Sequence, residues 1–281
     1  MLKNIFLEIE YDGTNYFGWQ IQNRPQGTQE GISELRTVQG ELEKALEKLF
    51  REKIRVSYGG RTDKGVHARG QCVNFKVDTK IPLNNIKEAL NSLLPDDVIV
   101  KRVEEVPLQF HSRFSVKSKV YRYVILNSEK GSVFYRNYTW FIRGKINLEK
   151  IERIIPHLIG KKDVSVFAKD AKKYKSCVRE IKSISVRKKE ALFMWIEEFL
   201  SQDSTTTSTF SNEYAPPQFI FIDIEAEGFL RNMARNLVAF LIKVGRGEIE
   251  LDVAEKIIYR KIPYVNKPAP PNGLYLLKIN Y

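Results

Sequence analysis

The order of strand-like and helix-like segments limits the fold more than any other feature of this sequence. Apolar and polar residues alternate where we expect strands, and apolar residues recur every three or four positions where we expect helices. Thr37, a residue type that caps helix N-termini, precedes the first helical pattern. In the first half we predict strands at 5–11, 54–58, 70–77 and 98–103, and helices at 37–50 and 82–94.

This β-α-β-β-α-β order is typical of a split βαβ, or ferredoxin-like, domain. The second half has related patterns without a residue-level repeat, and there we predict strands at 117–127, 181–186, 191–196, 219–224 and 275–281 and helices at 148–159 and 229–244. Two such units can pack together because exposed sheet edges seek partners. We therefore predict an α+β protein of two ferredoxin-like domains side by side around a central cleft, with largely antiparallel sheets.

The charge is distributed unevenly along the chain. Of 281 residues, 46 are Lys or Arg and 34 are Asp or Glu, a net charge of +12. Residues 1–110 carry 16 basic and 16 acidic side chains, so the whole excess lies in 111–281, where 161–189 alone hold 11 basic and 3 acidic residues. We expect an N-terminal α+β domain over 1–110 and a basic C-terminal α+β domain over 111–281. Such asymmetry favours a polyanionic partner, although a solvated Lys-rich surface would give the same counts.

Composition also excludes several classes of protein. A hydrophobic content of 43% excludes a wholly disordered chain. The longest purely apolar run, Leu237–Ile242, is too short to span a bilayer, and the N-terminus lacks the apolar core of a secretory signal. The two cysteines, Cys72 and Cys177, cannot form a disulfide framework or a Cys-based zinc site. We expect a cytoplasmic protein that does not bind membranes.

Two polar stretches fall outside the predicted elements. Residues 23–36 are rich in Gly and Gln, and residues 201–211 contain 8 Ser or Thr among 11 positions. Stretches of this kind cannot bury enough apolar surface to fold by themselves. We therefore expect both to form exposed surface loops.

The densest group of chemically useful residues lies in a glycine-rich connection at 58–71. One carboxylate, Asp63, stands among the cations of Arg61, Lys64 and Arg69, close to His67. A carboxylate near arginine stays ionised and can act as a nucleophile or general base. The same residues could instead form a turn held by an Asp63–Arg61 pair. His67 lacks the neighbouring ligands that a metal site would need.

Two further segments carry residue types that suit RNA. Alternation along the strand at 117–127 places Lys119, Tyr121 and Tyr123 on one face, where tyrosines could stack on bases, although tyrosine is also simply favoured in strands. The helix at 229–244 carries Arg231 and Arg235 beside two asparagines. That face could contact phosphate or ribose, or it could be an ordinary solvated face.

Taken together, these motifs resemble those of the tRNA pseudouridine synthase A family, from one end of the chain to the other. The matching segments are Tyr11-Asp12-Gly13 with Gly18-Trp19-Gln20, Thr37-Val38-Gln39-Gly40, Gly60-Arg61-Thr62-Asp63, Phe110-His111 with Arg113-Phe114, Tyr121-Arg122-Tyr123, Phe229-Leu230 with Arg235-Asn236, and Ala269-Pro270 with Gly273-Leu274-Tyr275. Each motif alone is weak, but seven in the same order make a specific signal.

The resemblance implies a reaction and a partner. The expected activity is isomerisation of uridine to pseudouridine in the anticodon stem-loop of tRNA, at positions 38–40. The resemblance also implies two α+β domains, a homodimer, and no need for a metal or organic cofactor. The alternative is a non-catalytic RNA-binding protein or tRNA-folding chaperone on the same fold. An intact Asp63 in its loop favours the enzyme, because a carboxylate gives a simple binder of phosphates no advantage.

The resemblance further implies roles for individual residues. Asp63 matches the catalytic aspartate, which attacks the flipped uridine at either C1′ or C6, and Arg61 matches the arginine that helps to expel or replace the base. Tyr121 matches the tyrosine stacked on the target, and Arg179 the arginine that pairs with the aspartate. Leu230 matches an apolar residue lining the uracil pocket. We also expect substrate contacts from the basic side chains Lys64, His67, Arg113 and Arg235. Lys64 and Ala234 depart from the usual family pattern of alanine and valine.

Overall fold

The structure is a computed structural model that describes residues 1–22, 35–190 and 218–281. The predicted strand at 191–196, the Ser/Thr-rich stretch at 201–211 and most of the polar stretch at 23–36 lie outside these residues. The described chain forms two compact units. Unit 1 comprises residues 1–122, 225–229 and 274–281, and unit 2 comprises residues 123–224 and 230–273. The predicted division of the chain at residue 110 stays a prediction.

The strands of unit 1 surround the long first strand, β1 (Leu2–Tyr11), in which Ile5, Leu7 and Ile9 are fully buried. β1 pairs in antiparallel fashion with β3 (His67–Asp78) on one side and β4 (Val98–Val106) on the other. β2 (Ser57–Tyr58) adds to β3 in antiparallel fashion, and β10 (Leu274–Asn280) adds to it in parallel. The chain's last strand therefore lies directly beside the start of β3, where the glycine-rich connection ends.

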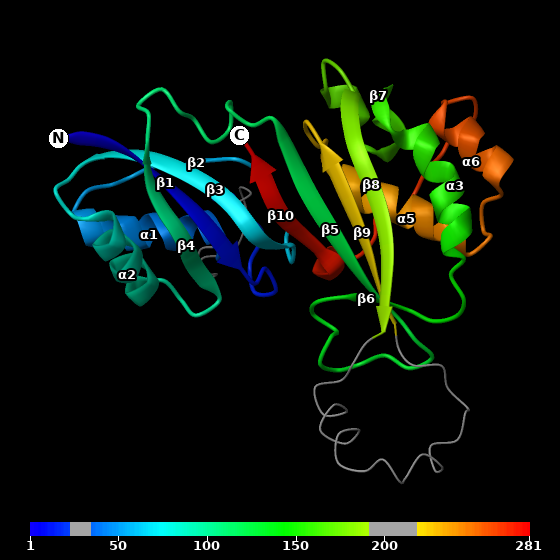
Figure 1. Cartoon of the computed structure of the whole chain (residues 1–281), viewed down its shortest axis with the longest axis horizontal. Helices are drawn as coiled ribbons and strands as arrows, with labels where there is room; N and C mark the ends of the chain where they lie inside the picture. The colour runs from blue at the N-terminus through cyan, green and yellow to red at the C-terminus, as the bar shows by residue number, and fades with distance from the viewer. Residues whose placement is uncertain (23–34, 191–217) are drawn as a thin grey trace, which may run out of the picture. The chain divides into compact units, whose positions relative to one another are not determined.

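Two helices cover one face of these strands: α1 (Val38–Phe50) and α2 (Leu83–Leu93), which lie next to each other in Figure 1. The buried face of α1 includes Val38, Leu42 and Leu46, spaced at the helical repeat. Its N-terminus is capped as predicted, because the Thr37 side chain accepts a hydrogen bond of 3.2 Å from the backbone N–H of Gly40.

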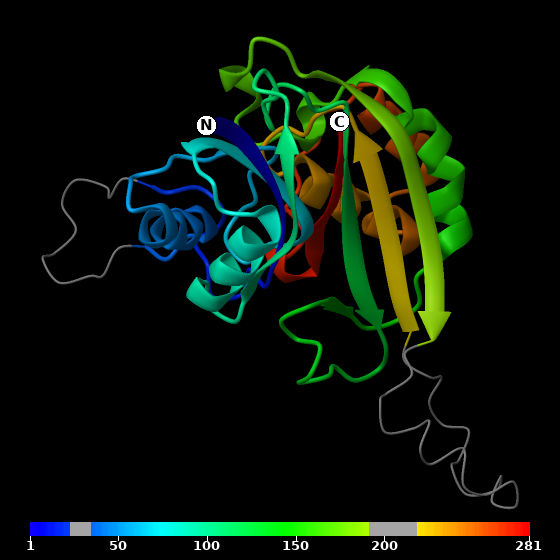
Figure 2. The same ribbon diagram turned by 60° about the vertical axis from the view of Figure 1, so that its left-hand side comes forward.

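The described helices of unit 2 lie on one face of its strands, as Figure 2 shows. The strands are β6 (Trp140–Ile142), β7 (Gly160–Asp163), β8 (Val178–Glu190) and parts of β5 (Ser118–Asn127) and β9 (Gln218–Ala226). The helices are α3 (Leu148–Leu158), α5 (Met233–Gly245) and α6 (Leu251–Ile258). α5 is buried on nearly every side, which explains its almost continuous apolar sequence.

Ten strands of the described chain are hydrogen-bonded in one mostly antiparallel sheet. Their order is β4-β1-β3-β10-β5-β9-β8-β7, with β2 on β3 and β6 on β5. This mixture of a largely antiparallel sheet with separate helices confirms the predicted α+β class. Among the described helices, none is long and apolar enough to cross a membrane.

Several element boundaries differ from the sequence-based predictions. β2 is confined to Ser57–Tyr58 rather than 54–58, and β8 continues to Glu190 rather than ending at 186. α5 begins at Met233, not at 229, because Asn232 adopts a left-handed conformation with φ of 60° that interrupts helical geometry. β6, β7 and α6 were not predicted from the sequence. β7 reads Gly-Lys-Lys-Asp and carries no apolar alternation.

Candidate active site

The predicted catalytic residue, Asp63, lies half-buried in the loop that joins β2 to β3 in unit 1. A glutamine anchors the start of this loop. The buried Gln71 side chain donates to the Gly60 carbonyl at 2.7 Å and accepts from the Gly60 N–H at 3.3 Å. Both polar groups of the Gly60 backbone are thus satisfied by one side chain, which holds the loop just before Arg61 and Asp63.

The segment after β1 supports the loop from a second direction. The Tyr11 hydroxyl and the Thr62 hydroxyl share a buried hydrogen bond of 2.8 Å, and the backbone N–H of Trp19 donates to the Thr62 carbonyl at 3.1 Å. Gly18 makes this approach possible, since its φ is +96° and a Cβ there would lie 2.6 Å from the Thr62 carbonyl oxygen. Thr62, which directly precedes Asp63 in the chain, is therefore fixed in place, and so is the backbone that follows it.

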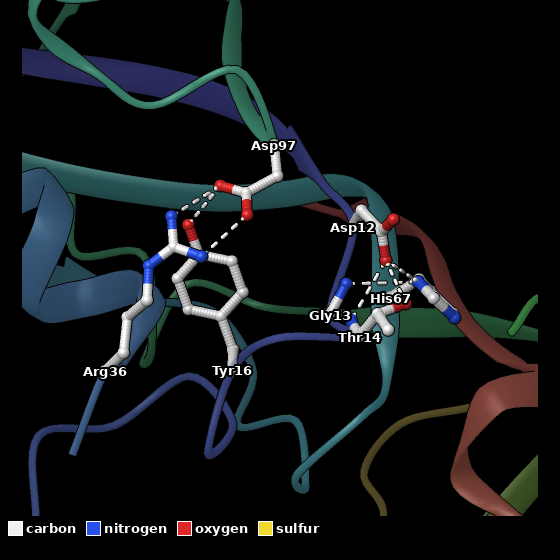
Figure 3. Close-up of polar contacts among 7 residues, drawn as sticks. All are labelled: Asp12, Gly13, Thr14, Tyr16, Arg36, His67 and Asp97. Carbon is white, nitrogen blue, oxygen red and sulfur yellow. Dashed lines mark hydrogen bonds and ion pairs between the residues drawn. The ribbon is translucent and has the colours of Figure 1, made fainter.

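A charged network holds the same segment at its far end (Figure 3). The Arg36 guanidinium donates two hydrogen bonds to the Asp97 carboxylate, of 2.8 and 3.0 Å, and the Tyr16 hydroxyl donates to the same carboxylate. The guanidinium also lies 4.3 Å from the centre of the Tyr16 ring. The Tyr16 carbonyl in turn accepts a hydrogen bond of 3.3 Å from the N–H of Gly65 in the catalytic loop. The network therefore connects to the backbone beside Asp63.

His67 is buried at the end of the loop, with 2% of its surface exposed. Its Nδ1 accepts a hydrogen bond of 3.0 Å from the Gly13 N–H and lies 3.1 Å from an Asp12 carboxylate oxygen (Figure 3). The ring stacks on Tyr275 at 4.7 Å between centres. These contacts give the histidine a structural role at the end of the loop, and its contact with substrate stays a prediction.

Tyr121 comes from β5 and lies buried beside the loop. Its hydroxyl donates to the Arg61 carbonyl at 3.4 Å, and its ring meets Phe229 edge-on at 4.8 Å. Burial raises the pKa of the Tyr121 phenol, and the negative charge of Asp63 adds to this effect. The structure of unit 1 thus places Tyr121 beside the segment that carries Arg61 and Asp63, and their catalytic roles stay predictions.

Arg61 and two further exposed cations of unit 1, Lys64 and Arg113, each contact a nearby aromatic residue. The Arg61 side chain donates from Nε to the Tyr58 hydroxyl at 3.1 Å, and the Lys64 ammonium lies 4.1 Å from the centre of the Phe17 ring. The Arg113 guanidinium lies 5.6 Å from the centre of the Phe114 ring. Exposed cations beside a half-buried carboxylate suit a polyanionic substrate that has to approach an ionised nucleophile.

The remaining predicted site residues, Arg179, Leu230 and Arg235, belong to unit 2. One Arg179 nitrogen, Nη1, donates to the carbonyls of Ser176 and Val178 at 3.2 and 2.6 Å. Leu230 is 4% exposed, and Arg235 donates from Nε to the Ala269 carbonyl at 2.6 Å. Their roles toward Asp63 and the substrate stay predictions.

Sequence reasoning missed the support behind the site. The Arg36–Asp97 pair joins residues 61 positions apart, and no local pattern signals it. The sequence placed Tyr16 and Gln71 only within segments that resemble the family, without a role for either side chain. Their hydrogen bonds to the loop depend on tertiary proximity, which a single sequence does not display.

Comparison with known proteins identifies the family of this chain. The family model described as tRNA pseudouridine synthase matches residues 8–115 and 154–281, which include the predicted site residues except Tyr121. The chain belongs to the tRNA pseudouridine synthase family, whose members are isomerases.

Individual relatives point to one branch of that family. Proteins named tRNA pseudouridine synthase A from Thermoanaerobacter sp. (strain X514) and Ruminiclostridium cellulolyticum are each 37% identical over 281 residues, covering 100% of both chains. One from Thermodesulfovibrio yellowstonii is 36% identical with the same coverage. A solved structure of an unknown protein from Galdieria sulphuraria is 12% identical with a TM-score of 0.22, over 88% of this chain and 94% of that one, which is too remote to inform fold or function. The relatives confirm the resemblance that the sequence motifs indicated.

Proposed function

We propose that this protein converts uridine to pseudouridine in the anticodon stem-loop of tRNA, at positions 38–40, with Asp63 as the nucleophile. The observation that carries the proposal is the position of the Asp63 carboxylate. It lies half-buried on a loop held by Gln71, Tyr11 and Trp19, beside the buried Tyr121. A rigid carboxylate next to an aromatic ring is what covalent attack on a nucleoside requires.

The chemistry is an isomerisation and needs no net input of atoms or electrons. The N1–C1′ bond of uridine breaks, a C5–C1′ bond forms, and the proton lost from C5 is balanced by one gained at N1. Asp63 makes a transient bond, either to C1′ of the sugar or to C6 of the base. The carboxylate departs again when pseudouridine is released.

Arg61 and Tyr121 help the target base to reach Asp63. A uridine within a paired stem has to leave the stack, at a cost of about a few kcal/mol. The planar Arg61 guanidinium, exposed at the loop, can fill the vacated space, since arginine stacks well on bases. The Tyr121 ring offers a surface against which the extruded base can lie. Leu230 would line the uracil pocket, and Arg179 would pair with Asp63.

Several finer features belong to the same proposal. The strand order β4-β1-β3 with β2 on β3, and helices on one face, supports a ferredoxin-like fold for the first domain, and we extend it to the second. A cleft between the two would hold the tRNA arm. We further propose a cytoplasmic homodimer, in keeping with the resemblance. Basic side chains Lys64, Arg113 and Arg235, with His67, would contact the substrate around the cleft.

The test is to incubate the purified protein with unmodified tRNA transcripts and map pseudouridine at every uridine. We expect product at one or more of positions 38, 39 and 40 and at no other position. Product confined to another arm of the tRNA would contradict the choice of substrate region. Binding without product at any uridine would favour the non-catalytic RNA-binding alternative, which no present observation supports.

A further inference from the structure

A lysine lies beside the catalytic loop and has no role in the mechanism above. Lys119 is half-buried on β5, two residues before Tyr121. Its ammonium nitrogen lies 3.6 Å from the point where a Cβ on Gly60 would stand, and its Cδ lies 3.8 Å from that point. The ammonium is therefore next to the residue that precedes Arg61 in the catalytic loop.

Lys119 has no counter-ion in the described part of the chain. No hydrogen bond or ion pair joins its ammonium to another residue there. Glu225, a carboxylate on β9, is instead bonded to Ser118 at 2.5 Å and to Asn280 at 3.3 Å. Other charged side chains on the segments around Lys119 include Arg113 in the loop before β5, Asp223 on β9, Lys278 on β10, and Arg61 and Asp63 in the loop that joins β2 to β3, and of these Arg113 acts on the Lys119 charge.

The arrangement is electrostatically unfavourable for the protein alone. Burial of the ammonium, with a smaller contribution from the positive charge of Arg113, lowers the pKa of Lys119 to about 8. Two cations whose positive charges act on each other lose free energy unless an anion joins them. A phosphodiester oxygen fits this need, because lysine and arginine both donate charge-assisted hydrogen bonds to phosphate.

We propose that Lys119 and Arg113 form a binding site for one backbone phosphate of the tRNA, next to the nucleotide that reacts with Asp63. Arginine supplies the exposed part of the site and lysine the half-buried part, beside Gly60. A phosphate held there would fix the distance between the RNA backbone and the loop. The proposal rests on the proposed function, because it takes tRNA as the ligand of the Asp63 site.

The test combines a lysine variant with a neutral phosphate linkage. Wild-type protein and K119M are titrated with a labelled anticodon-arm RNA in which single phosphates around the target uridine are replaced by methylphosphonate, one RNA per linkage. We expect K119M to bind the unmodified RNA about three- to tenfold more weakly. For the wild type, a methylphosphonate at one particular linkage should weaken binding by a similar factor. K119M should bind the RNA with that methylphosphonate as tightly as it binds the unmodified RNA. Additive losses at every linkage would overturn the proposal.

The pH dependence of binding gives a second, independent arm. If a phosphate holds the ammonium charged, wild-type affinity should fall about two- to fivefold from pH 7 to pH 9, because Lys119 has to gain a proton before binding. K119M should lose that dependence. K119R should also lose it and bind at pH 9 at least as well as the wild type, since arginine stays charged. An unaltered pH dependence in K119M would contradict the proposal.

Two controls distinguish a failure of the proposed phosphate site from a failure of the proposed function. K117M changes an exposed lysine two positions away in the same chain and should behave as the wild type in both arms. Pseudouridine formation by the wild type in the same unmodified RNA tests the proposed function directly. Product with additive linkage losses would contradict the phosphate site alone, whereas absence of product would contradict the proposed function. Thermal melts of K119M and K119R establish that each variant is folded.

Discussion

At the scale of single residues, the site depends on one carboxylate and on the neighbours that fix its loop. Asp63 itself was visible in the sequence as the lone acid among cations. The residues that hold its loop were not visible there. Gln71 bonds both polar groups of the Gly60 backbone, and Tyr11 and Trp19 hold Thr62. The proposed nucleophile is therefore positioned by residues that lie both before and after it in the chain.

The substitution D63N tests the nucleophile. The amide keeps the size and polarity of the side chain but cannot form the covalent bond to the nucleoside, so we expect pseudouridine formation to fall by more than about a thousandfold. tRNA affinity should change by no more than about threefold. D78N, at the exposed end of β3, removes an equal charge and should leave both quantities at the wild-type level. Near-normal turnover by D63N would show that another group attacks the uridine.

The substitution G18A tests whether close backbone approach positions the loop. An alanine at residue 18 would have to keep the unfavourable φ of +96°, and its Cβ would lie 2.6 Å from the Thr62 carbonyl oxygen. G144A makes a matched control, because Gly144 has a φ of +88° with nothing within 4 Å of its Cβ position. We expect both to lose about 1 kcal/mol of folding free energy to backbone strain, and only G18A to lower kcat, by about tenfold or more. Equal kcat values for the two variants would remove Gly18 from the positioning of the loop.

At the scale of elements, the catalytic loop gains its position from the segments that precede α1 and β4. Arg36 lies just before α1, and Asp97 lies just before β4. Their ion pair, with the Tyr16 hydroxyl, joins both segments to the stretch that supports the loop (Figure 3). A half-buried bidentate pair of this kind is expensive to break, because each remaining partner keeps its desolvation cost.

The substitution D97N tests this connection. It removes the carboxylate charge and one of the two acceptors, so we expect the free energy of unfolding to fall by about 2 kcal/mol, measured by urea denaturation. Catalysis should fall in kcat more than in KM, because the loop that carries Asp63 would be less well fixed. D96N alters the exposed neighbouring carboxylate and should change stability by less than about 0.5 kcal/mol. A D97N protein as stable as D96N would show that the network contributes nothing.

At the scale of the whole molecule, positive charge and the catalytic carboxylate come from different parts of the chain. The lysines at 161–175 lie on β7 and on the short turns that follow it in unit 2, whereas Asp63 lies in unit 1. Most of them are exposed, as expected of side chains that neutralise phosphates rather than stabilise a fold.

Neutralising three of these lysines tests their contact with tRNA. We expect the triple variant K169Q, K172Q and K175Q to weaken binding and to reduce the slope of log affinity against log salt by about two. The matched control, K48Q with K53Q and K80Q, removes the same charge from exposed lysines of the neutral half and should leave the slope nearly unchanged. Equal slopes for both triple variants would place the tRNA away from 161–175.

Much of the fold was predictable where a helix or strand has a clear local pattern of apolar residues. The capped helix α1 and the strands β1, β5 and β9 were found within a few residues, because their apolar periodicity comes from burying one face. β7 and α6 were missed, because Gly-Lys-Lys-Asp has no apolar alternation and an eight-residue helix is too short for a firm pattern. Pairing of β10 with β3 places Tyr275 opposite His67, residues far apart in the chain, and no local pattern encodes that.

The sequence alone determined the α+β class, the family and the identity of the reactive loop, because each is written in residue types at fixed spacings. Only the tertiary structure decided that His67 is buried against Gly13, that Asp97 bonds Arg36 and Tyr16, and that Lys119 lies beside Gly60 without a counter-ion among the described residues. These features depend on distances between residues far apart in the chain. Burial and long-range electrostatics act through space, so they appear only once the strands and loops have been brought together.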